Sequence, residues 1–355
     1  MSATVRIGRT ADGIWTIAPE GAPTVLDAAA AIDAMVLEVV GGHLSWSLLT
    51  GQTIPAAAID NLELAHDWLW AVYGEQIAVA IADFGSGAGE VTDGVQFTDA
   101  GEFAAEPAVP DLVTAAWRLG FGYWAARWWP ASTIDGITPL DDRLLDQEIT
   151  ALRAECELLL DDETAPDNET VDITPADEVS TRAADYALAA GGGADRRAGV
   201  LSLGRGTGGW DWRRCPPGLI DASERAVSWE SIRDSGTTTV RVTAVAAPQL
   251  GSAAPAHLHP RAFITTPVGT AEAELNLIGD LWTGTATTPS DSVSAVDVYV
   301  PGVGAIPDLE SGGPQMRRRI RELAAARLRR ATGSDDAVDA PLLAEIAAAA
   351  SDSDF

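Results

Sequence analysis

The chain has 355 residues, 46% of them hydrophobic, so it is long enough and apolar enough to bury the cores of two domains. Its 52 acidic residues outnumber 23 basic ones, and the formal net charge of -29 argues against a large nucleic-acid surface, which would need many cations. Every basic residue is an arginine. The absence of lysine excludes Schiff-base chemistry and any phosphate-binding lysine.

The cysteines and the apolar runs indicate the cellular compartment in which we expect the protein. Cys156 and Cys215 are the only cysteines and lie far apart, so no disulfide framework is expected. The N-terminal residues lack the apolar stretch of a signal peptide, and no apolar run reaches membrane-spanning length. We therefore expect a cytoplasmic protein that binds neither membrane nor nucleic acid. The arginine- and alanine-rich composition is typical of a GC-rich bacterial genome.

The first part of the chain predicts strands and helices in mixed order. Residues 4–9 and 14–18 flank Asp12-Gly13, a pair suited to a tight turn, and predict a β-hairpin. The alanine-rich residues 26–40 predict a helix that Gly41-Gly42 would end, and residues 44–49 a short strand. Residues 55–73 predict a second helix, and residues 77–84 a buried strand.

Two further helices complete this acidic region. Residues 111–129 place Trp117, Phe121, Trp124 and Trp128 on one helical stripe, which predicts a helix packed on a sheet or, alternatively, an exposed aromatic surface. Residues 138–160 predict a helix capped by Thr138, whose apolar seam suits packing on a neighbouring helix or a second copy. The acidic residues 161–178 predict a linker, and residues 175–190 a helix.

From residue 199 the pattern changes to short β-like runs separated by turn residues. Six or seven such runs over about a hundred residues are typical of an antiparallel β-sandwich. The predicted fold class is therefore α+β. A mixed α+β domain at 1–160, an acidic linker with a helix at 161–198 and a β-sandwich at 199–304 precede a C-terminal helical extension at 305–355, with an acidic tail.

A basic helix at 316–331 is the most unusual element of this chain. It carries seven arginines, while residues 1–180 hold 31 acids against 6 arginines. Arg327 falls in the middle of its apolar face, so the helix must dock on carboxylates or carbonyls, in its own chain, in a second copy or in another protein. Residues 340–350 predict a small alanine-rich helix after it.

Candidate catalytic and metal-binding residues are few. Asp234-Ser235-Gly236 resembles the catalytic triplet of aspartic proteases, but that chemistry needs two such aspartates, so a dimer would have to share the site. His257 and His259 could supply two metal ligands, although an exposed loop is the simpler interpretation. Cys215 lies beside Arg214 with no identifiable base. Gly204, Gly206 and Gly209 match the dinucleotide-binding spacing without the helix that should follow.

These patterns favour a non-catalytic interaction protein, an adaptor or a subunit of a larger assembly, that needs no cofactor. It would bind protein partners, or a second copy of itself, through the sandwich and the basic helix. The candidate contact residues combine arginine with tryptophan, as interface hot spots do. They are Arg317, Arg318, Arg319, Arg321, Arg327, Trp210, Trp212 and Arg213. The alternatives are a hydrolase, using Asp234 or the two histidines, and a small-ligand module with a pocket lined by Trp210, Trp212 or Trp282.

Overall fold

The computed structural model describes residues 3–27, 31–85, 101–160, 201–215, 217–251, 254–304, 313–331 and 340–352. The expected linker at 161–178 and the helix at 175–190 lie outside these residues. The α+β class, the β-sandwich and the C-terminal arginine-rich helix are confirmed. Among the described helices, none is long and apolar enough to cross a membrane.

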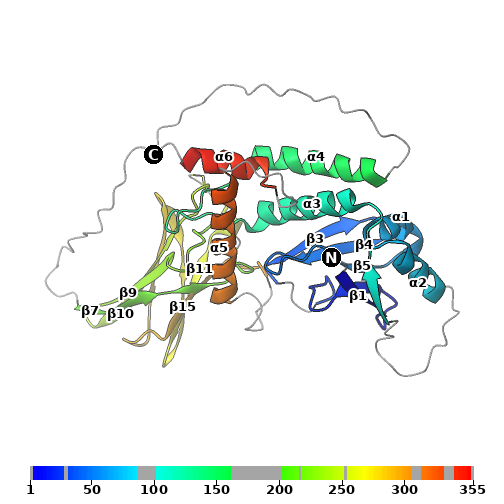
Figure 1. Ribbon diagram of the computed structural model, residues 1–355. Helices are drawn as coiled ribbons and strands as arrows, with labels where there is room; N and C mark the ends of the chain where they lie inside the picture. The colour runs from blue at the N-terminus through cyan, green and yellow to red at the C-terminus, as the bar shows by residue number, and fades with distance from the viewer. Residues whose placement is uncertain are drawn as a thin grey trace.

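The N-terminal part is a six-stranded antiparallel sheet covered by helices on one face (Figure 1). Its spatial order is β3-β4-β5-β2-β1-β6, which places β3 at one edge. The strands have the following bounds: β1 Ala3–Arg9, β2 Trp15–Pro19, β3 Ala34–Val39, β4 Gly42–Ser47, β5 Ala56–Ile59 and β6 Gly101–Ala105. The predicted hairpin is β1–β2, with Gly13 at a positive φ of 86° in its turn.

Four helices accompany this sheet: α1 Leu62–Tyr73, α2 Glu75–Gly85, α3 Pro110–Trp128 and α4 Asp142–Leu160. Helix α3 packs on the sheet, and α4 lies over α3 as an outer layer (Figure 1). The predicted aromatic helix is confirmed, and Phe121 and Trp124 are buried, as expected for a core stripe. The seam of α4 packs on α3, where Ile149 lies over Gly122. Asp141, not Thr138, caps α4, accepting from the amides of Arg143 and Leu144.

Two expected elements in this region were wrong, and the predicted helix at 55–73 is confirmed only over residues 62–73, which form α1. Residues 34–39 are strand β3 rather than part of a helix, and the burial of Met35 and Leu37 between exposed Val36 and Glu38 shows the period of two. Residues 56–59 are a strand buried on both faces in the middle of the sheet, so tertiary context outweighs the helix propensity of alanine. Residues 75–85 are helix α2, in which Ile77 and Ile81 are buried at a four-residue spacing.

The C-terminal part is a sandwich of two sheets, ordered β13-β14-β10-β9-β7 and β12-β11-β15-β8. All strand pairs are antiparallel except β8 with β15. The strands have the following bounds: β7 Leu201–Thr207, β8 Gly209–Trp210, β9 Val227–Asp234, β10 Thr237–Val245, β11 Arg261–Thr266, β12 Gly269–Glu274, β13 Asn276–Ile278, β14 Leu281–Thr287 and β15 Ala295–Tyr299. A short 3-10 helix, Ala256–Leu258, precedes β11.

Helices α5, Pro314–Ala331, and α6, Leu343–Asp352, connect the two parts. Helix α5 runs between the sandwich and the N-terminal part, and α6 packs on α4 (Figure 1). Asp221 of the sandwich reinforces this junction. It is fully buried and accepts hydrogen bonds from Ser132 Oγ at 2.6 Å and from the amide of Thr133 at 2.7 Å.

Candidate functional site

Strand β3 has one backbone edge that pairs with none of the described strands. The amide of Leu48 donates to the carbonyl of Asp33 at 2.8 Å, which fixes which residues face β4. Because this pattern alternates along an antiparallel pair, residues 35, 37 and 39 exchange hydrogen bonds with β4, while Val36 and Glu38 direct their amides and carbonyls outward. Among the described residues, no strand pairs with this outer side of β3.

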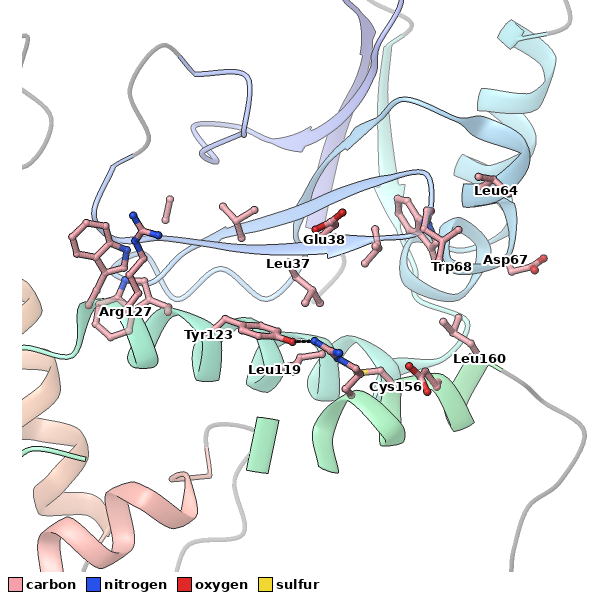
Figure 2. A pocket seen from close by; sticks show the side chains of 18 of the residues that line it. Leu37, Glu38, Leu64, Asp67, Trp68, Leu119, Tyr123, Arg127, Cys156 and Leu160 are labelled. Atoms are coloured by element: carbon pink, nitrogen blue, oxygen red, sulfur yellow. Dashed lines mark hydrogen bonds between the residues drawn. The ribbon is translucent and has the colours of Figure 1, made fainter. Parts of the chain in front are cut away.

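A groove of about 1110 Å³ runs beside this edge (Figure 2). Its walls come from β3 and from helices α1, α3 and α4. Leu37 of β3 points toward Leu119 and Tyr123 of α3, and Trp68 and Leu64 of α1 close one end (Figure 2). The walls are therefore built from the sheet edge and from three helices of the N-terminal part.

Large apolar side chains remain exposed around the groove. Val40 is 65% exposed and Leu64 is 55% exposed, and Val36 and Leu160 are also exposed. All four line the groove. Exposed apolar side chains that form one patch mark interaction sites more often than exposed apolar side chains scattered singly over a surface.

The two ends of the groove carry opposite charge. Asp67 lies at the α1 end and Arg127 at the opposite end, with Glu38 between them on β3 (Figure 2). The Trp68 indole donates to the carbonyl of Val40 at 2.8 Å, which fixes the α1 end to the end of β3. The Trp124 indole donates to the carbonyl of Ile32 at 2.8 Å, which brings the last turns of α3 to the start of β3.

Two side chains on the helical wall limit its chemistry. Arg153 of α4 donates to the hydroxyl of Tyr123 and packs over its ring. Cys156 also lines the groove, and burial, helped by the neighbouring Glu155 and Glu157, raises the pKa of its thiol to about 11. A thiol with that pKa is almost wholly protonated at neutral pH, so Cys156 is a poor nucleophile.

The basic helix is held largely by carboxylates of its own chain. Arg317 donates to both oxygens of Glu224, at 2.7 and 2.9 Å, and Arg321 donates to Glu224 at 3.1 Å and lies 3.3 Å from Asp135. Burial alone would raise the pKa of Glu224, but the two arginines lower it overall. Arg327 is buried against Glu345 and Phe121.

The other predicted contact residues are either exposed on α5 or buried or paired within the sandwich. Arg318 and Arg319 are exposed, with Arg318 paired to Glu322 and Arg319 donating to the carbonyl of Leu49. Trp210 and Trp212 are buried in the sandwich core, and Arg213 pairs with Asp211. These two tryptophans and the equally buried Trp282 do not line the groove. Only Arg318 and Arg319 of the predicted set are left as an accessible surface on α5.

The predicted chemical residues are dispersed. Asp234 lies exposed at the tip of the β9–β10 hairpin, where Ser235 and Gly236 take positive φ values. The His259 ring packs at a steep angle to the Trp282 ring, beside the 3-10 helix. The described part of the chain contains no group of three or more side chains able to hold a metal. Cys215 is fully buried, which raises the pKa of its thiol.

Sequence reasoning missed the groove because it assigned β3 to a helix. One local signal was available: Gly41-Gly42 follows the alternating residues 35–39 and precedes another β-like run. Gly41 has a φ of 78°, and a Cβ there would lie 2.5 Å from the carbonyl oxygen of Asn61, so the turn needs glycine. The glycine pair therefore forms a hairpin rather than a helix end.

No family model matches the chain, and no curated protein or solved structure compared with it matches either. The class of protein that the fold and the site define is an α+β protein with an open sheet edge beside an apolar groove.

Proposed function

We propose that the protein is a non-catalytic interaction protein, an adaptor or a subunit of a larger assembly, that binds an extended segment of a partner protein along β3. The observation that carries the proposal is the coincidence of the unpaired edge at Val36 and Glu38 with the apolar groove beside it. In strand addition, backbone hydrogen bonds supply affinity, and pockets for alternate side chains supply specificity.

The size and lining of the groove support a polypeptide rather than a small metabolite. At about 1110 Å³ the groove lies at the upper end of the range of roughly 300 to 1,000 Å³ for small-molecule pockets, so it has room for several side chains of a bound segment. The lining combines apolar surface with charged side chains that are spread along the groove rather than gathered into a convergent catalytic set: Glu38, Asp67, Arg127, Arg153 and Glu157. An open, apolar sheet edge is a hazard that proteins usually cover, which suits an edge kept for a partner.

Most of the contact residues predicted from the sequence therefore lie outside the proposed partner surface at β3. Arg317, Arg321 and Arg327 stabilise the docking of α5 on its own chain. Arg318 and Arg319 supply a secondary contact surface at most. The two unpaired cysteines agree with a reducing cytoplasm as the place of action.

The test is selection of binding peptides followed by variants of the edge. Peptides of twelve residues displayed on phage are selected on the full chain, and fluorescence anisotropy measures the affinity of the synthetic winners. Val36→Pro should weaken binding at least about tenfold, because proline removes the outward amide and adds a ring at the edge. Val36→Thr keeps the amide and the β-branched shape, so it is the matched control and should bind like wild type.

Three outcomes would overturn the proposal. One is failure to select any peptide, and another is equal binding by wild type and Val36→Pro. The third is a dimer of the wild type, seen by analytical ultracentrifugation, that Val36→Pro abolishes, since the occupant would then be a second copy. Because the Val36 amide lies outside the ladder with β4, Val36→Pro should stay folded, and circular dichroism checks this.

A further inference from the structure

The charges at the two ends of the groove indicate which charge the bound segment carries at each end. We infer that the partner segment adds antiparallel to β3, with basic residues at its N-terminal end and acidic residues or a free carboxylate at its C-terminal end. This inference rests on the proposed function. It names the chemical character of the segment, which strand addition alone leaves open.

The acidic end coincides with the end of β3. Asp67 is exposed there, and Leu160 ends α4 at the same end of the groove (Figure 2). Glu157, three residues before Leu160 on α4, is also exposed and lines the groove. These carboxylates attract a basic segment as it approaches this end of the groove.

The basic end coincides with the start of β3. Arg127 is exposed there and packs beside the Trp128 ring, with the ring centroid 5.2 Å from its guanidinium carbon. An antiparallel strand begins opposite Val39 and ends opposite Ala34. Its N-terminal residues therefore meet Asp67 and Glu157, and its C-terminal residues meet Arg127. A parallel strand would match these ends only with acidic residues first and basic residues last. All the described strand pairs of the N-terminal sheet are antiparallel, which favours antiparallel addition at β3.

The alternation of side chains along β3 also determines which side chains of the segment enter the groove. A residue opposite Leu37 carries its side chain on the Leu37 face, toward Leu119 and Tyr123, so it should be apolar. The residue opposite Glu38 lies on the other face, beside that carboxylate, and should be basic or a hydroxyl residue. The expected segment alternates apolar and polar residues between charged ends.

The probe is a pair of blocked peptides with identical composition and opposite order. The forward peptide is acetyl-Arg-Arg-Val-Thr-Val-Thr-Val-Glu-Glu-amide, and the control is its reversal. A strand of nine residues extends roughly 30 Å, enough to pass β3 at both ends. Both peptides are neutral overall, so general attraction to the acidic protein cannot distinguish them.

By fluorescence anisotropy, the full chain should bind the forward peptide about fivefold more tightly than the reversed one, and the preference should shrink at about 1 M salt. The double variant Asp67→Arg with Arg127→Glu exchanges the end charges at exposed positions and should reverse the preference. Cross-linking from a photoreactive group on the N-terminus should label the region around Cys156, and from the C-terminus the region around Arg127.

The outcomes separate the two proposals. Equal affinity for both peptides, with loss of binding in Val36→Pro, would overturn the direction and leave strand addition standing. A preference for the reversed peptide would mean parallel addition and would also overturn the inference. Binding of neither peptide would overturn the inferred charge and side-chain pattern, whereas strand addition itself is decided by the selected peptides and Val36→Pro.

Discussion

The guanidinium of Arg327 donates to the carboxylate of Glu345 from two nitrogens, at 2.6 and 2.8 Å, and both side chains are buried. Arg327 also lies over the Phe121 ring of α3, with 4.1 Å from its guanidinium carbon to the ring centroid. One charged pair on α5 and α6 therefore contacts the aromatic stripe of the N-terminal part. This contact satisfies the buried arginine that the sequence placed on an apolar helix face.

Arg327→Ala should lower the free energy of unfolding by about 3–5 kcal/mol, because Glu345 would remain buried and charged without its partner. Urea denaturation followed by tryptophan fluorescence measures this loss. Arg327→Met combined with Glu345→Gln removes both charges and should recover much of it, since glutamine can still accept from the amide of Leu342. Arg318→Gln, at an exposed pair, should change stability by less than about 1 kcal/mol.

Asp221→Ala should destabilise the junction between the two parts of the chain by at least about 3 kcal/mol. The substitution leaves donors on buried Ser132 and Ser223, and the part-buried amide of Thr133, without their acceptor. Hydrogen exchange should rise in residues 131–137 ahead of the strands of either sheet. Unchanged exchange in that loop together with unchanged stability would contradict the junction role of Asp221.

The docking of α5 should weaken at acidic pH through Glu224. Its pKa is lowered overall in the folded chain, so its stabilising effect is present above its unfolded value, near 4.5, and is lost as pH falls through the folded value. Burial raises the pKa of Glu148, which acts in the opposite sense, favouring the folded state as pH falls toward 4.5. The variant Glu224→Gln removes the contribution of Glu224 and leaves that of Glu148. Its free energy of unfolding should be about 2 kcal/mol lower than that of wild type at pH 7, and this difference should shrink below pH 4.

The two cysteines should differ in their reaction with iodoacetamide. Cys156 is partly accessible with a pKa of about 11, so its alkylation should be slow at pH 7 and rise steeply toward pH 10. Cys215 is fully buried and should react only after unfolding. Mass spectrometry of the modified peptides distinguishes them. A groove-bound peptide should slow the alkylation of Cys156, and a peptide without that effect would bind elsewhere.

Local patterns in the sequence determined several elements without help from the rest of the chain. Residues close together in sequence were enough to predict three features: the turn at Asp12-Gly13, the aromatic stripe of residues 111–129 and the turn-separated strands after residue 199. The same holds for α5, because Arg327 in the middle of its apolar face needs a buried acceptor wherever that face packs. Period, turn chemistry and the cost of burying charge are local properties.

Only the tertiary structure shows which carboxylates pair with the arginines of α5 and where the groove lies. Glu345, Glu224 and Asp135 lie in different parts of the sequence, and only packing brings them to the arginines of α5. Gly206 belongs to an apparent nucleotide-binding string, yet a Cβ there would lie 2.8 Å from Trp229, so its place in the sheet explains the glycine. The alanines of β5 are strand because both their faces are buried, and β3 is an edge because no described strand continues the sheet. Burial and neighbour identity depend on contacts between distant residues, which no local pattern contains.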